Sequence, residues 1–153
     1  MSAVRIHTPD VNLAKLIRKP GGKAVADALS GASEGLKEMS GSVLAELKST
    51  LAAAETCLAA NPTGEGVEEL YLTIARPIGA ASLCGLAAAD EVLTSLATLL
   101  DAMRQDVPWA PEPVRLHLHG LGLLLNAPED SDETRALVDG LKKVTKRYVG
   151  EAG

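Results

Sequence analysis

Leucine and alanine recur three and four positions apart along most of this chain. Together they supply 48 of its 153 residues, and the chain contains no phenylalanine. Cores of β-sheets depend on β-branched and aromatic side chains, whereas a spacing of three and four places apolar residues along one face of a helix. The sequence therefore predicts an all-α protein, an elongated antiparallel bundle of about five helices.

Five segments carry this periodicity, at about residues 23–60, 63–78, 86–103, 112–126 and 130–149. Pro77 lies inside the second segment and removes one backbone hydrogen bond, so a kink is predicted over residues 73–77. The fourth segment differs from the others because apolar residues lie almost all around it. Such a helix is buried on both faces or meets a second molecule.

The domain organisation follows from proline, glycine and chain length. Residues 1–22 contain Pro9 and end in Pro20-Gly21-Gly22, which stops a helix and predicts an extended, basic N-terminal arm. Residues 23–149 are expected to form a single helical-bundle domain, and residues 150–153 a disordered tail.

Charge is distributed unevenly around the formal net value of −5. Residues 1–23 carry a net +4, residues 24–134 a net −12, and residues 135–153 a net +3. An acidic body argues against nonspecific binding of nucleic acid, which needs a positive surface. No apolar run approaches a bilayer span, and the N-terminus does not resemble a secretory signal, so no membrane contact and a cytoplasmic location are expected. Cys57 and Cys84 fit reduced core residues, with a disulfide or redox pair as the alternative.

Two histidines in the fourth segment are the most chemically suggestive residues. A phosphotransfer histidine needs a solvent-facing imidazole on a helix, usually in the pattern His-x-x-Lys-Gly. His117 is followed four residues later by Leu121 and His119 by Leu123, and the lysine is absent. Structural histidines are the favoured interpretation, and a phosphoacceptor at His119, or at His117, is the alternative. Histidines two apart point to different sides of a helix, so no metal site is predicted.

No other motif indicates catalysis or a cofactor. The acidic pairs and clusters at 68–69 and 130–133 fit the starts of helices, where negative charge is favourable. No serine or cysteine has a histidine at a spacing that suggests a nucleophile. The chain is therefore predicted not to be an enzyme and to need no cofactor.

Two features suggest a protein partner. Leu116, Gly120 and Leu123, with His119 beside them, form a second apolar stripe, where the glycine would admit a close helix. The stripe is expected to be covered by a helix of a partner protein, by a second copy of this chain in a homodimer, or by the chain's own N-terminal arm. The second feature is the basic end of the arm, Arg18 and Lys19. These residues form either a docking contact for a partner or a solvated connector.

Three stretches carry a resemblance to a known family. Residues 12–22 read Asn-Leu-Ala-Lys-Leu-Ile-Arg-Lys-Pro-Gly-Gly, residues 69–76 read Glu-Leu-Tyr-Leu-Thr-Ile-Ala-Arg, and Trp109 precedes a helix with Val114-Arg115-Leu116-His117. They resemble the basic leader, the Leu-Tyr helix and the Val-x-x-His helix of the CheE-like chemotaxis accessory proteins of alphaproteobacteria. Pro77 and the glycine-rich first helix depart from that pattern.

The resemblance implies a function in chemotaxis or two-component signalling, without an enzymatic activity to carry over. We therefore expect a binding module that contacts a response regulator or a histidine kinase. Histidine phosphotransfer is the alternative.

Overall fold

The computed structural model describes residues 25–105, 107–126 and 131–150. The chain divides between Glu34 and Gly35 into two units. In the first unit the described residues, 25–34, are helical, and the buried core lies in the second unit. The predicted arm (1–22), with Arg18 and Lys19, and residues 151–153 of the predicted tail lie outside the described residues.

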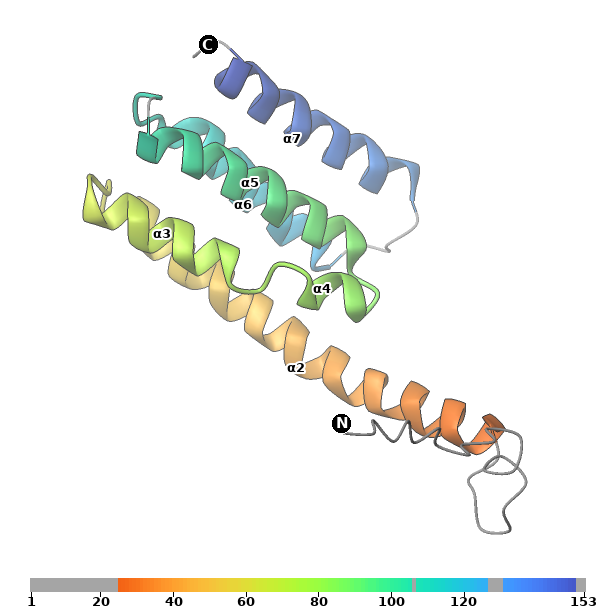
Figure 1. Ribbon diagram of the computed structural model, residues 1–153. Coiled ribbons are helices and arrows are strands. Elements are labelled where there is room, and N and C mark those ends of the chain that lie inside the picture. Colours follow the sequence, from red (N-terminus) through yellow and green to blue (C-terminus); the bar gives the residue numbers. More distant parts are fainter. Residues whose placement is uncertain (1–24, 106, 127–130, 151–153) are drawn as a thin grey trace, which may run out of the picture. The chain divides into compact units, whose positions relative to one another are not determined.

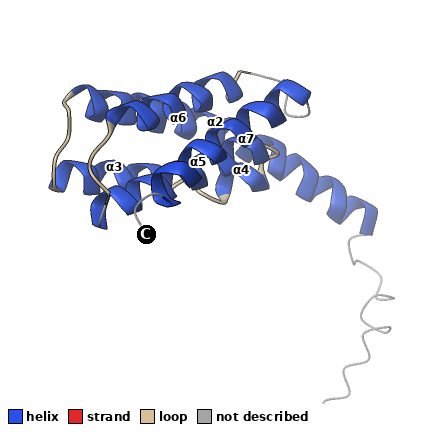
Figure 2. Ribbon diagram, turned by 90° about the horizontal axis from the view of Figure 1, so that it is seen from above, coloured by secondary structure: helices blue, strands red, loops and turns tan. Residues whose placement is uncertain are grey.

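The described chain is helical and contains no strand, which confirms the predicted all-α fold (Figures 1 and 2). The helices are α2 (Val25–Ala59), α3 (Glu65–Ala75), α4 (Ala80–Leu83), α5 (Ala87–Gln105), α6 (Pro111–Leu124) and α7 (Asp132–Gly150). Five of them are long and match the five periodic segments, while α4 is a single turn of four residues. No separate helix was predicted at the position of α4.

The kink predicted at Pro77 is instead a break. α3 ends at Ala75, and the backbone N–H of Arg76 donates the last hydrogen bond, to Leu72 at 3.2 Å. Pro77 has no N–H to continue the ladder, and Gly79 follows with a positive φ of 88°. The N–H of Gly79 then donates to the carboxylate of Asp90 at 2.6 Å, which ties the connection to the first turn of α5.

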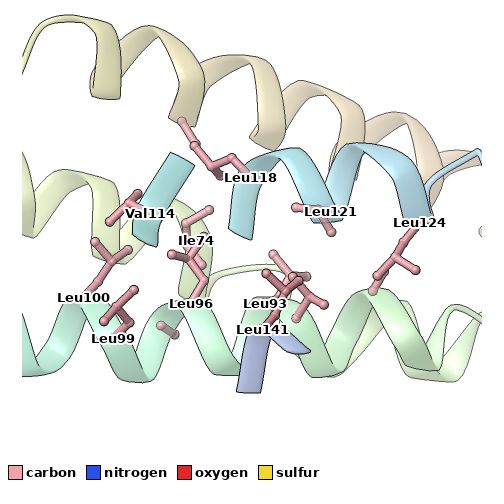
Figure 3. Close-up of a cluster of buried hydrophobic side chains, with 14 of the residues drawn as sticks. Ile74, Leu93, Leu96, Leu99, Leu100, Val114, Leu118, Leu121, Leu124 and Leu141 are labelled. Carbon is pink, nitrogen blue, oxygen red and sulfur yellow. The ribbon is translucent and has the colours of Figure 1, made fainter. Parts of the chain in front are cut away.

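α5 is the central helix of the second unit, because it packs against α3, α4, α6 and α7. The core is almost entirely aliphatic, and Figure 3 shows side chains of α5 and α6 meeting in it. Its fully buried leucines include Leu93, Leu96, Leu100 and Leu121. Each side chain of this size contributes about 1.5–3 kcal/mol when it leaves water.

Two glycines let α6 lie close to its neighbours. A Cβ on Gly120 would stand 2.6 Å from Cδ1 of Leu141 on α7, and one on Gly122 would stand 3.3 Å from Cδ2 of Leu51 on α2. Residues two apart on a helix point to nearly opposite sides. α6 therefore has α7 against one flank and α2 against the other, and α5 covers its inner face.

Candidate functional site

The outward face of α6 is partly apolar and uncovered. Leu116 is 49% exposed and Leu123 is 53% exposed, and His119 between them is also exposed. Gly120, which the sequence analysis grouped with the two leucines, is buried. Its close helix is α7 of the same chain, so the predicted stripe separates into an outer pair, Leu116 and Leu123, and an inner notch.

On the α7 side, Leu116 borders a groove of about 540 Å³. Its other lining residues are Glu112, Pro113, Val144, Arg147 and Tyr148. The groove combines an exposed leucine with the partly buried side chains of Val144 and Tyr148. Such a mixture of apolar walls and a few polar groups at the rim suits a protein side chain as the occupant.

On the α2 side, His119 borders a smaller hollow of about 190 Å³. Glu55 of α2 and Arg115 of α6 line the same hollow, so a carboxylate and a guanidinium lie near the imidazole. Arg115 also forms an ion pair of 2.5 Å with Glu112. His119 is therefore accessible and has charged neighbours of both signs.

His117 has the opposite environment. Its exposed fraction is 0%, and both ring nitrogens are hydrogen-bonded inside the core. Nδ1 lies 2.7 Å from the carbonyl oxygen of Pro113, which can only accept, so Nδ1 carries the proton. Nε2 must then be an acceptor, and it lies 3.1 Å from Oγ of Ser95 and 3.0 Å from Oγ1 of Thr145.

The two hydroxyls complete a network that joins three helices. Oγ of Ser95 on α5 lies 2.8 Å from Oγ1 of Thr145 on α7, and the Thr145 hydroxyl can also donate to the Ser95 carbonyl at 3.3 Å. Within the described residues no buried side-chain nitrogen or oxygen lacks a hydrogen-bond partner. The network is thus fully satisfied, which is the condition for a polar cluster to be tolerated in an apolar core.

Burial lowers the pKa of His117, because removing the imidazolium from water disfavours the charged form. The carbonyl groups of Pro113 and Leu141 act in the opposite direction and do not overcome the desolvation. The imidazole is consequently neutral at neutral pH.

A serine hydroxyl beside a histidine resembles the start of a nucleophile–base pair, but here the imidazole is fully buried, and only Ser95 and Thr145 reach the edge of a groove between α5 and α7. Ser95 is only 7% exposed, and it shares its hydroxyl with Thr145. It lies in the interior of α5, where the backbone N–H groups are used within the helix and do not form an oxyanion site. The arrangement therefore satisfies hydrogen bonds in the core and is not suited to attack a substrate.

This network was not predicted, because Ser95 and Thr145 are 22 and 28 residues away from His117 in the chain. A usable signal exists nonetheless. Thr145 takes a core position between Leu141 and Tyr148 in the apolar spacing, and Ser95 does the same within α5. Polar residues at core positions on two helices, together with a histidine at a core position on a third, indicate a buried cluster.

Cys57 does not lie in a setting that activates a thiol. Cys57 and Cys84 are free thiols, each partly buried. The Cys57 thiol donates to the carbonyl of Gly66 at 3.6 Å. Burial, and secondarily the charge of Glu69, raises the pKa of Cys57, which disfavours the thiolate that a nucleophile or metal ligand requires.

Fold and site together define a helical bundle with one half-exposed apolar helix face and one buried imidazole network. Comparison with protein-family models, with curated proteins and with solved structures finds nothing that matches the chain. None of the described helices combines the length and the apolar character that crossing a membrane would require.

Proposed function

We propose that this chain is a non-enzymatic protein-binding module of bacterial chemotaxis or two-component signalling, which contacts a response regulator or a histidine kinase through the outward face of α6. One observation carries the proposal. Leu116 and Leu123 stay half exposed on a helix whose other sides are packed against α2, α5 and α7.

The spacing of these two leucines suits a helical partner. They are seven residues apart, two turns or about 10.5 Å along the axis, and form a short apolar ridge. A partner helix laid along this ridge could also place a side chain in the groove beside Leu116 and Tyr148. Covering the exposed half of each leucine would contribute about 1 kcal/mol per residue.

The signalling context rests on the resemblance of residues 12–22, 69–76 and 110–125 to the CheE-like family. The third of these stretches includes α6, so the proposed contact lies within one of the stretches that carry the resemblance. The basic residues Arg18 and Lys19 are proposed to add an electrostatic contact with an acidic partner.

Binding to purified receiver domains and histidine kinases of the source bacterium, measured by calorimetry, tests the proposal. The double variant Leu116→Glu/Leu123→Glu should weaken binding at least tenfold. Leu72→Glu is the matched control, because Leu72 is a leucine on α3 with a similar exposed fraction of 57%. Equal loss in both variants, or none in the double variant, would contradict a contact through α6.

A second candidate function is histidine phosphotransfer. It is favoured by the exposed position of His119 in the hollow that Glu55 and Arg115 also line. His117 is not retained as an acceptor, because its ring is enclosed and both nitrogens are occupied. Incubation with a phosphorylated receiver separates the two functions: acid-labile phosphate on this chain that disappears in His119→Gln would establish phosphotransfer and overturn the binding-only proposal.

A homodimer through Leu116 and Leu123 is a further form that the partner could take. Sedimentation equilibrium at high protein concentration distinguishes it. A monomer mass for the wild-type protein excludes the homodimer, whereas a dimer that Leu116→Glu/Leu123→Glu dissociates would make the second copy the occupant of this face.

A further inference from the structure

Two of the four side chains that α7 buries are polar, which is a larger share than in α5. α5 buries eight apolar side chains and one polar one, Ser95. α7 buries only four side chains, of which Val138 and Leu141 are apolar and Thr134 and Thr145 are polar. Leu137 and Tyr148 of α7 also pack against the core while partly buried. The hydroxyl of Thr145 is the polar group of α7 that meets Ser95 and His117.

The groups that face His117 are all uncharged. They are Ser95 from α5, Thr145 and the Leu141 carbonyl from α7, and the Pro113 carbonyl from its own helix.

The charged residues of these three helices nearest the network line surface grooves, and Ser95 and Thr145 line one of these grooves as well. Asp90, Glu91, Lys142 and Lys146 line the groove between α5 and α7, and there Lys142 pairs with Glu91 at 2.5 Å. Glu112, Arg147 and the titratable Tyr148 line the groove between α6 and α7, and Arg115 pairs with Glu112 on the surface of α6. Within the described residues, no carboxylate forms an ion pair with the imidazole.

We propose that His117, Ser95 and Thr145 form an acid-sensitive latch, in which proton uptake by His117 releases α7 from α5 and α6 while the other helices stay packed. The proton would add a positive charge in a site without a counter-ion. It would also convert Nε2 from an acceptor into a donor, so the hydroxyl that donates to it must turn its hydrogen away and the hydrogen bonds of the network must rearrange. Release of α7 lets water solvate the imidazolium, which the closed core does not.

The direction of the pH dependence follows from the lowered pKa of His117. With α7 released, the imidazole titrates near its ordinary value of about 6.5, whereas with α7 in place it resists the proton. The packed position of α7 is therefore most favoured above about pH 6.5. Below that pH, the equilibrium constant for packing of α7 falls by up to about tenfold per pH unit. Between pH 7.5 and 5.0 the population with α7 released should rise by up to about 30-fold.

Hydrogen–deuterium exchange of the full chain, read by mass spectrometry at pH 7.5 and 5.0 and corrected for intrinsic exchange, tests this latch. In the wild-type protein, peptides of α7 should lose at least tenfold more protection than peptides of α3. His117→Gln keeps a hydrogen-bonding side chain that does not titrate, and should abolish the difference. His119→Gln is the matched control, because it removes an exposed histidine of the same helix and should leave the difference unchanged.

Several outcomes would overturn the latch: α7 as protected at pH 5.0 as at pH 7.5, the same loss in His117→Gln, or loss of protection in all helices together. If His117→Gln does not fold, nuclear magnetic resonance of the wild-type imidazoles replaces it. His117 should then titrate below pH 6.5, at the same midpoint as the amide shifts of α7. A His117 midpoint at or above 6.5, or α7 shifts with a different midpoint, would refute the proposal.

Discussion

Gly120 and Leu141 touch across the α6–α7 contact so closely that a Cβ on the glycine would stand 2.6 Å from Cδ1 of the leucine. Leu141 is itself 2% exposed, so its methyl group has little room to move away. The close approach of the two helices thus depends on the absence of a single methyl group at position 120.

Gly120→Ala should therefore lower the free energy of unfolding by about 1 kcal/mol, because overpacking costs about 1–3 kcal/mol and the better helix propensity of alanine returns up to about 1 kcal/mol. Gly140→Ala is the matched control: a Cβ at Gly140 on α7 meets nothing within 4 Å. It should raise stability by about 0.4–1 kcal/mol. Urea unfolding followed by circular dichroism measures both, and stabilisation by Gly120→Ala would contradict the close contact.

The Ser95–His117–Thr145 network predicts non-additive mutational effects. Ser95→Ala or Thr145→Val alone leaves one hydroxyl to donate to Nε2 of His117, so each should cost about 1 kcal/mol. The double variant leaves that nitrogen buried without a donor and should cost about 1 kcal/mol more than the sum of the two. A double-mutant cycle of urea unfolding provides the measurement, and strict additivity would show that the two hydroxyls do not share the acceptor.

Arg104 joins α5 to α3 through two contacts. Its guanidinium pairs with Glu68 and lies 4.2 Å from the ring centroid of Tyr71. Arg104→Lys keeps the charge but loses the planar group that stacks on the ring, so it should cost about 0.5–1 kcal/mol. Adding salt should recover little of this loss, since screening weakens the ion pair of wild type and variant alike. Lysine as stable as arginine at this position would show that the stacking contributes nothing.

The raised pKa of Cys57 predicts slow alkylation. Fewer thiolates are present at a given pH than in a free cysteine, so the rate with iodoacetamide should rise only at higher pH. The Cys84→Ser variant isolates this thiol, and the same variant in denaturant serves as the control. A pH–rate profile identical in the folded and denatured states would contradict the effect of burial.

Much of the fold follows from local spacing alone. The three–four recurrence of leucine and alanine located the five long helices, because that pattern depends only on helix geometry. The break after Ala75 was not predictable, since proline either kinks or ends a helix, and the choice here involves the distant carboxylate of Asp90.

The candidate site was predictable only where the exposure of a residue follows from its angular position around its own helix. Leu116 and Leu123 were assigned to a second face because a turn of about 100° per residue places them opposite the main apolar side, and both are half exposed. Gly120 was assigned to the same face, but it lies about 40° around the helix from Leu116, which is enough to turn it under α7. The partners of His117 come from two other helices, and such contacts depend on tertiary packing that spacing within one helix does not contain.

The two glycines of α6 affect both its buried side and its exposed side. Gly120 leaves room for Leu141 on one flank, and Gly122 leaves room for Leu51 on the other. Together the two glycines fix the rotation of α6 about its own axis. With that phase set, His117 must point inward and His119 outward. A bulky residue at either glycine position would rotate α6 about its axis. The same rotation would displace the buried imidazole of His117 and the exposed leucines.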